Sequence, residues 1–174
     1  MKKRLAMVVA LALFLAIGTA VASPVHPNTF GIGALWGSSV GGGGGNFQDN
    51  NRVALSLKFP TLPVFWGVRL GGFGDTIWVG VQGDHYFMGS QLTRTLGWFL
   101  GVGAYGQIWL GDDMAFGFGG RLPIGLTWQP LRFLEVFGNV APQIGGYIYT
   151  HGDGGFEFPH GGFLGIELGI RVWL

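Results

Sequence analysis

The feature that most constrains this chain is a two-residue alternation that recurs along most of its length. In the final segment, GIELGIRVWL, every second residue from Ile166 to Leu174 is large and aliphatic, whereas the positions between them hold Gly, Glu, Arg and Trp. A period of two is the geometry of a β-strand, whose side chains point alternately to opposite faces. The pattern therefore predicts strands that each have one bulky face and one small or polar face.

Eight segments show this alternation, and turn-forming residues separate them. The expected strands are residues 29–38, 51–59, 64–71, 76–87, 95–110, 114–128, 133–149 and 161–174. Short turn signals rich in Gly, Pro and Asp lie at 60–63, 74–75, 89–90, 111–113 and 129–130, and longer loops at 41–51 and 150–160. Pro123 and Pro142 fall inside strands, where we expect bulges or kinks, because proline cannot donate to the ladder. Eight antiparallel strands suit either a sandwich or a closed barrel.

The distribution of charge over the two faces separates these alternatives. Bulky faces turned inward would send about four large side chains per strand into a lumen that eight strands make narrow. With those faces outward, glycine and polar residues fill the lumen, and no Arg meets lipid, where its cost is about 2 to 4 kcal/mol at the midplane. The sequence thus predicts an all-β fold, an eight-stranded antiparallel up-and-down transmembrane β-barrel. The expected lumen polar network is Arg52, Lys58, Arg69, Asp84, Arg121, Glu135, Glu167 and Arg171.

Composition supports a membrane protein that crosses by strands. Only 11% of the residues are charged, against roughly 25% in soluble globular proteins. After the first 22 residues no uninterrupted apolar run reaches the roughly 18 residues of a membrane helix.

The N-terminus reads as a cleaved secretory signal over residues 1–22. Lys2, Lys3 and Arg4 precede an apolar run, and Ala20-Val21-Ala22 provides a small-residue cleavage site. The barrel would then occupy residues 23–174, with seven basic and nine acidic residues, a balance that gives no reason to expect nucleic acid as a partner. The absence of Cys excludes disulfides and a lipidated cysteine.

Tryptophan spacing suggests two girdles of interface aromatics at the membrane surfaces. Alternating strand directions place four tryptophans near periplasmic strand ends and three near outer ends. The first group is Trp66, Trp98, Trp128 and Trp173, and the second is Trp36, Trp78 and Trp109.

The C-terminus resembles the signal that the barrel-assembly machinery reads in outer-membrane barrels. Glu167, Gly169, Val172 and Leu174 follow its polar-x-Gly-x-x-apolar-x-apolar pattern, with Leu in place of the commoner terminal Phe. The alternative is an ordinary C-terminal strand.

A longer stretch resembles a known family. The segment GGRLPIGLTWQPLRFLEVFGNVAPQIG, with SLKFPTLP and GDHYF upstream, is similar to small outer-membrane proteins of spirochaetes whose function is unknown. The resemblance implies a barrel like the OmpX and OmpW porin-like proteins, in the outer membrane of a diderm bacterium. It implies outer-membrane lipid as surroundings, loops exposed at the surface and, for some relatives, binding of host proteins. It brings no active site.

No motif points to an enzyme or a cofactor. The GVGAYG glycines have dinucleotide-loop spacing, but strand alternation continues through them and no helix follows. His151, Asp153, Glu157 and His160 are close in sequence, but their spacing matches no established zinc site and a polar loop would look the same. We therefore expect no catalytic residue, cofactor or metal.

Two functions remain open. One is a structural and surface-interaction protein, with adhesion or host-factor binding through the loops at 41–51 and 150–160. The other is a narrow channel or transporter of small or hydrophobic solutes, for which the many interior glycines would leave space.

Overall fold

The computed structural model describes residues 26–40, 52–73, 76–110, 114–149, 155–157 and 163–174, and these are almost entirely strand. The expected signal peptide and most of the two long loops lie outside the described residues. The strands are β1 (Gly31–Val40), β2 (Arg52–Lys58), β3 (Phe65–Phe73), β4 (Thr76–Gln91), β5 (Leu96–Leu110), β6 (Ala115–Arg121), β7 (Ile124–Leu131), β8 (Leu134–Tyr149), β9 (Gly155–Glu157) and β10 (Phe163–Trp173).

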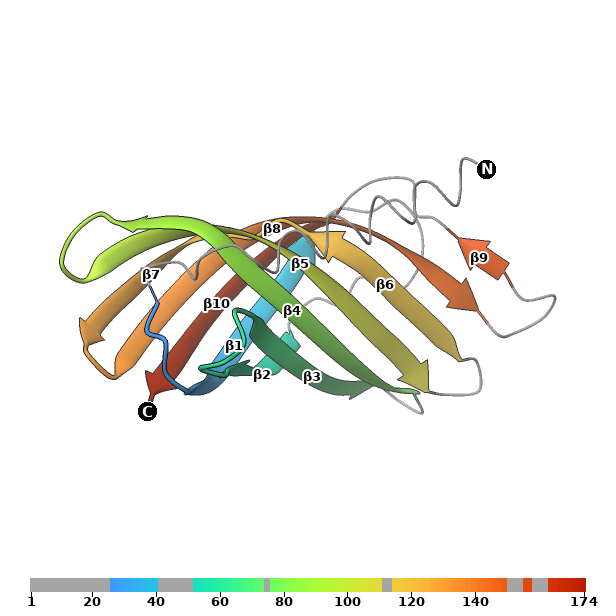
Figure 1. Ribbon diagram of the computed structural model, residues 1–174. Helices are drawn as coiled ribbons and strands as arrows, with labels where there is room; N and C mark the ends of the chain where they lie inside the picture. The colour runs from blue at the N-terminus through green and yellow to red at the C-terminus, as the bar shows by residue number, and fades with distance from the viewer. Residues whose placement is uncertain (1–25, 41–51, 74–75, 111–113, 150–154, 158–162) are drawn as a thin grey trace.

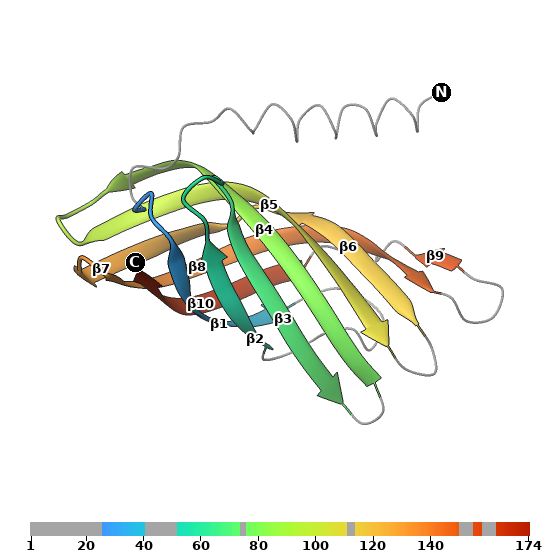
Figure 2. The same ribbon diagram turned by 60° about the horizontal axis from the view of Figure 1, so that its bottom comes forward.

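The strands form one closed antiparallel barrel (Figures 1 and 2). From β1 to β6 each strand pairs with the next along the chain, and β1 closes the barrel by pairing with β10 from Gly31–Trp173 to Val40–Leu164. β6 and β7 are two halves of one barrel strand, because both lie between β5 and β8 in an unchanged register. β9 pairs only with the end of β8. The wall therefore has eight strands, which confirms the predicted fold class.

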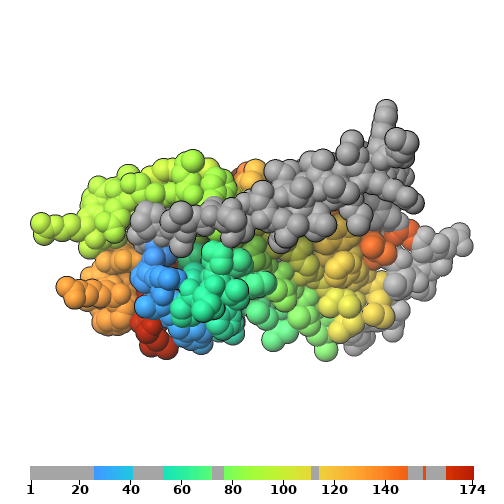
Figure 3. All heavy atoms as spheres, viewed as in Figure 1, coloured from blue at the N-terminus to red at the C-terminus, as the bar shows by residue number. Residues whose placement is uncertain are grey.

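Strand ends agree with the sequence pattern to within a few residues, and the largest difference is in one hairpin. Residues 89–90, expected as a turn, belong to β4, which continues to Gln91. The β4–β5 hairpin therefore extends beyond its neighbours at the end of the barrel that carries the turns at 60–63 and 129–130, here named the turn end (Figure 3, light green). A register shift between Tyr86 and Met88 marks a β-bulge that leaves Phe87 unpaired.

The two strand prolines behave differently. At Pro123 the ladder is interrupted between β6 and β7, as expected for a residue without an N–H. Pro142 stays within β8, opposite Leu164 and without a register shift, so of the predicted bulge or kink no bulge forms there. Its carbonyl oxygen still accepts a hydrogen bond from Leu122 N at 3.0 Å, because only the donor is missing in proline.

The outer surface of the barrel is apolar, as the alternation predicted. Large aliphatic and aromatic side chains are exposed on every wall strand, with Leu70 at 70% and Val53 at 65%. Soluble proteins rarely expose such a continuous apolar surface. Among the described residues there is no helix with the length and apolar character of a membrane span.

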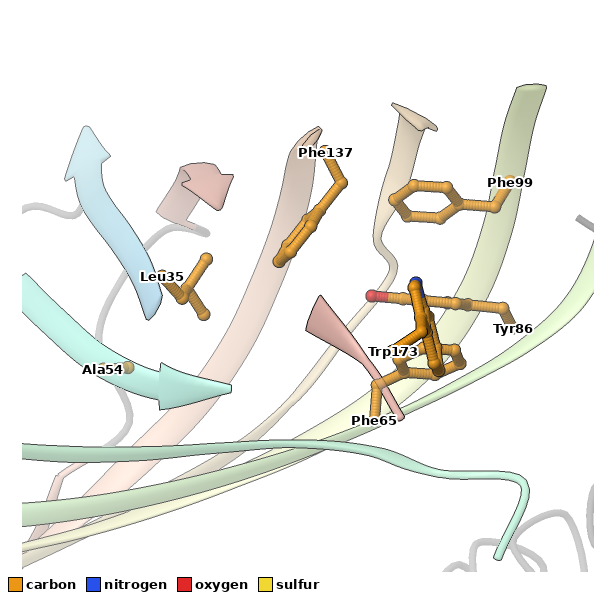
Figure 4. Packing of buried hydrophobic residues seen from close by; sticks show 7 residues of the cluster. All are labelled: Leu35, Ala54, Phe65, Tyr86, Phe99, Phe137 and Trp173. Atoms are coloured by element: carbon orange, nitrogen blue, oxygen red, sulfur yellow. The ribbon is translucent and has the colours of Figure 1, made fainter. Parts of the chain in front are cut away.

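The interior is more aromatic than the sequence pattern suggested. A cluster near the turn end comprises Leu35, Ala54, Phe65, Tyr86, Phe99, Phe137 and Trp173 (Figure 4). A second cluster, toward the opposite end, comprises Trp78, Trp109, Ala115 and Tyr147. Glycine and alanine alone do not fill the lumen, because rings from several strands occupy it as well.

Several of these inward rings face a glycine on a neighbouring strand, whereas Phe65 is paired with Lys58 and Asp84. Phe137 pairs with Gly169, Tyr86 with Gly101, and Tyr147 with Gly117. A Cβ added to Gly101 would lie 2.6 Å from the Tyr86 ring, and one added to Gly117 2.9 Å from the Tyr147 ring. The interior glycines therefore make room for aromatic rings.

The interface role predicted for all seven tryptophans is wrong for three of them. Trp78, Trp109 and Trp173 are each 5% exposed and face the interior. Their positions in the alternation are those of the glycine and charged residues, so strand geometry outweighs any preference of the ring for an interface. Trp36 and Trp128 are exposed on the outer surface, and Trp66 and Trp98 are partly exposed.

Candidate functional site: the polar lumen

Seven of the eight residues predicted for the lumen network have described side chains, and six of these are almost fully buried. Lys58, Asp84, Arg121, Glu135, Glu167 and Arg171 are between 0% and 3% exposed. Arg69 is half-buried and reaches the same interior through its contact with Glu167. The side chain of Arg52 lies outside the described residues.

The first group of charges is centred on Arg121 and is named here the central network. Its guanidinium donates to both carboxylate oxygens of Glu167, at 2.7 Å each, and its Nε lies 3.2 Å from Asp84 Oδ1. Arg69 donates to the same Glu167. Two cations thus meet two anions, and the group has no net charge.

Two amides complete the central network. Gln82 Oε1 accepts a hydrogen bond of 2.8 Å from Arg121, and Asn139 Nδ2 donates one of 3.0 Å to Glu167. Buried charges are tolerated when hydrogen bonds satisfy their remaining donors and acceptors. The amides therefore stabilise the ion pairs in a lumen that little water enters.

The second group lies closer to the turn end and is named here the basal network. Arg171 donates to Glu135 at 2.8 Å and to Ser56 Oγ at 2.9 Å, and Thr127 Oγ1 donates to Glu135 at 2.7 Å. The Arg171 guanidinium also lies 4.5 Å from the ring centroid of Phe137. Such cation–π contacts add to the stabilisation where water is excluded.

The strand register explains why these side chains meet. Arg171 and Glu135 are directly paired residues of β10 and β8, and Glu167 pairs with Asn139 on the same two strands. Arg121 pairs with Gly103, where an added Cβ would overlap the Asp84 carboxylate. The absence of a side chain at Gly103 lets Asp84 and Arg121 approach each other.

Lys58 does not join either carboxylate group. Its Nζ donates to the carbonyl oxygen of Phe59 at 2.6 Å and lies 5.7 Å from the Phe65 ring centroid. It lies at the last residue of β2, so it is at the turn end of the lumen.

His26, which precedes the first strand, closes the lumen at the turn end. Its side chain is 3% exposed, and Nδ1 lies 2.9 Å from Glu135 Oε1. Its ring contacts Phe65, Tyr86 and Phe99, with centroid separations of 4.8, 5.3 and 5.4 Å. The segment before β1 thus inserts a ring among those of the wall.

Most lumen residues missing from the sequence prediction lie on the same strand faces as those included. Gln82 is two residues from Asp84, Asn139 four from Glu135, and Ser56 two from Lys58. The two-residue alternation could therefore have predicted that these three side chains face the lumen. His26 had no such signal, because it belongs to no alternating segment.

Beyond the central network the lumen opens into a small polar cavity. Arg69, Gln82, Arg121 and Glu167 line it, with small residues of β1 and β10 around them. Its volume of about 40 Å³ has room for only a few water molecules, each of which needs roughly 10 to 15 Å³ by this measure. Within the described part of the chain no three His, Cys, Asp or Glu side chains are grouped as a metal site.

Comparison with known proteins gives similarity of fold only. No family model matches the chain, and no curated protein matches it. The solved structures with a similar fold include Neisserial surface protein A (NspA), with 10% identity and a TM-score of 0.47, and Ail, the attachment invasion locus protein of Yersinia pestis, with 12% and 0.40. The first covers 85% of this chain and 98% of its own, and the second 84% and 97%. At these values we draw no functional argument from them.

Proposed function

We propose that this chain is an outer-membrane barrel that acts as a structural and surface-interaction protein, and that its lumen does not conduct. Its apolar outer wall and charged interior support residence in a bilayer, because this distribution reverses that of a soluble protein. The proposal includes a cleaved signal over residues 1–22, recognition of the C-terminal strand by the barrel-assembly machinery, and kinship with the small spirochaetal barrels.

The observation that favours surface interaction over transport is that side chains fill the lumen. Interior glycine was the reason to consider transport, but rings occupy the space beside Gly101, Gly117 and Gly169. The central and basal networks and the His26 ring fill much of what remains. A solute would have to break buried ion pairs to pass.

Because the lumen is filled, we assign binding of partners to the loops at the opposite end of the barrel, here named the loop end. The loops at 41–51 and 150–160 are the longest connections in the sequence, and loops on a rigid scaffold commonly carry binding. Host proteins are the proposed partners. Most of both loops lies outside the described residues, so this part rests on sequence.

Planar-bilayer recording of the refolded protein tests the closed lumen. We expect no steady conductance above that of a protein-free bilayer. A double variant, Arg121→Ala with Arg171→Ala, removes the guanidinium of each network and should introduce measurable current. Steady, ion-selective current from the unmodified protein would instead favour transport.

Loop binding needs a separate measurement. Cells that display the full barrel should adhere to immobilised host matrix proteins, and deletion of residues 42–50 or 151–160 should abolish adhesion while leaving heat-modifiable gel mobility intact. Adhesion that survives both deletions would contradict the assignment to these loops.

A further inference from the structure

Large side chains do not cover the outer wall uniformly. A hollow lies over β3, β4 and β5. The hollow has a volume of about 500 Å³ and is named here the wall groove. Val64, Trp66, Val81 and Val102 form its sides, and Ala104 and Gly106 part of its floor. This volume lies within the range of small-molecule sites, roughly 300 to 1,000 Å³.

Small outward residues create the wall groove. A Cβ added to Gly106 would meet nothing within 4 Å, so this position on the outer face is open. The groove also adjoins a shallower hollow over β6 and β8, because Ala104 and Tyr105 line both. An apolar hollow alone would identify no ligand, since any hydrocarbon chain could lie in it.

His85 supplies the second observation. It lines the wall groove and is 7% exposed, on the outward face of β4. Its Nδ1 lies 2.7 Å from the carbonyl oxygen of Pro63. A carbonyl oxygen can only accept, so Nδ1 donates, and in the neutral ring Nε2 is then a bare acceptor.

That acceptor is buried without a hydrogen-bond partner in the described part of the protein. A buried unsatisfied polar atom costs roughly 1 to 3 kcal/mol, so a donor brought to it would be favoured. Trp66 Nε1, in the same groove, is likewise buried and has no hydrogen-bond partner among the residues described. The lining of the groove thus includes one acceptor and one donor in an apolar setting, and the acceptor at His85 suits a hydroxyl group.

We propose that the wall groove binds the hydrocarbon chain of a single amphiphile, with a hydroxyl-bearing head at His85. The groove opens on the apolar outer face, so its ligand arrives from a hydrocarbon phase. His85 lies beside the 60–63 turn, where a polar head would reach the membrane surface at the turn end. The site is separate from the lumen and the loops, so it does not depend on what the loops bind.

The probe is dodecanol that carries a diazirine in its chain. The matched control compound is dodecyl methyl ether with the same diazirine, which has no O–H group to donate a hydrogen bond. The protein is refolded in an alkyl dimethylamine oxide, whose head has no hydrogen-bond donor to compete. Photolabelling should concentrate on peptides containing residues 81–85 and 102–106. The alcohol should bind about tenfold more tightly than the ether, the factor that corresponds to a hydrogen bond of roughly 1.4 kcal/mol.

Two variants and a matched control test the inference. Gly106→Leu places a large side chain in the groove from a position where an added Cβ meets nothing within 4 Å, and it should abolish localised labelling. His85→Phe should keep labelling but bind alcohol and ether equally. Ala34→Leu introduces the same side chain on the exposed face of β1, away from the groove, and should behave as wild type.

The outcomes separate binding from simple contact with detergent or lipid. Heat-modifiable mobility checks that each variant is folded. Labelling spread evenly over the outer wall, labelling unchanged in Gly106→Leu, or equal affinity of wild type for alcohol and ether would each overturn the proposal. So would crosslinked dimers in place of labelled monomers, because the occupant would then be a second copy.

Discussion

Replacing Arg121 with Leu tests whether the central network holds the barrel together. The guanidinium donates to both oxygens of Glu167 and to Gln82, and it forms the ion pair with Asp84. Its removal leaves Glu167 with Arg69, Asn139 and a long hydrogen bond from Gln82, and it takes away the cation that pairs with Asp84. Breaking a buried pair by removing one partner typically costs about 3 to 5 kcal/mol, so the unfolding free energy should fall by that amount.

The assay is urea unfolding of the barrel refolded in lipid vesicles, with Arg94→Leu as the control. Arg94 is exposed in the turn between β4 and β5, and its replacement should change stability by no more than about 0.5 kcal/mol. An Arg121→Leu barrel as stable as wild type would show that water replaces the lost contacts. A destabilised Arg94 variant beside an unchanged Arg121 variant would refute the inward assignment.

A double variant separates charge pairing from packing. Removing Arg121 and Glu167 together leaves Arg69 and Asp84, one cation and one anion, so the central network stays neutral. The double variant should therefore lose less stability than the two single losses added, with a coupling energy of roughly 0.5 to 3 kcal/mol. Additive losses would mean that the two side chains act only through packing.

Three further predictions concern the glycines of the barrel wall, the His26 ring at the turn end and the orientation of the barrel in the membrane. Gly33→Ala should destabilise the barrel by about 1 to 3 kcal/mol in urea unfolding, because its Cβ would overlap a carbonyl oxygen of the neighbouring strand, whereas Gly106→Ala should be neutral. His26→Ala should lower the urea midpoint, because it removes the ring packed in the turn-end mouth; an unchanged midpoint would show that this ring contributes nothing. An epitope inserted at Gly43 should bind antibody on intact cells and one at Thr61 should not, and the opposite result would invert the topology.

The sequence predicted the strands and the faces of the charged residues because both follow from one geometric rule. In β8 the aliphatic residues Leu134, Val136 and Val140 share one face, so the inward position of Glu135 followed directly. The β4–β5 hairpin was shortened in the prediction because Gly89 and Ser90 are common in turns. In the structure both residues pair with β5, next to Phe99 and Trp98, and cross-strand packing outweighs their turn preference.

The contents of the lumen were harder to predict because the size of a side chain was treated as a guide to its direction. Phe137 and Trp173 are large, yet they occupy inward positions of β8 and β10, directly opposite Gly169 and Gly31. Which glycine faces which ring depends on strand register, and alternation within one strand does not specify that register. A glycine-rich interior therefore has two readings, empty space or space shared with a ring on the next strand. Here the rings occupy it, and the same glycines that suggested a channel are what allow the lumen to be filled.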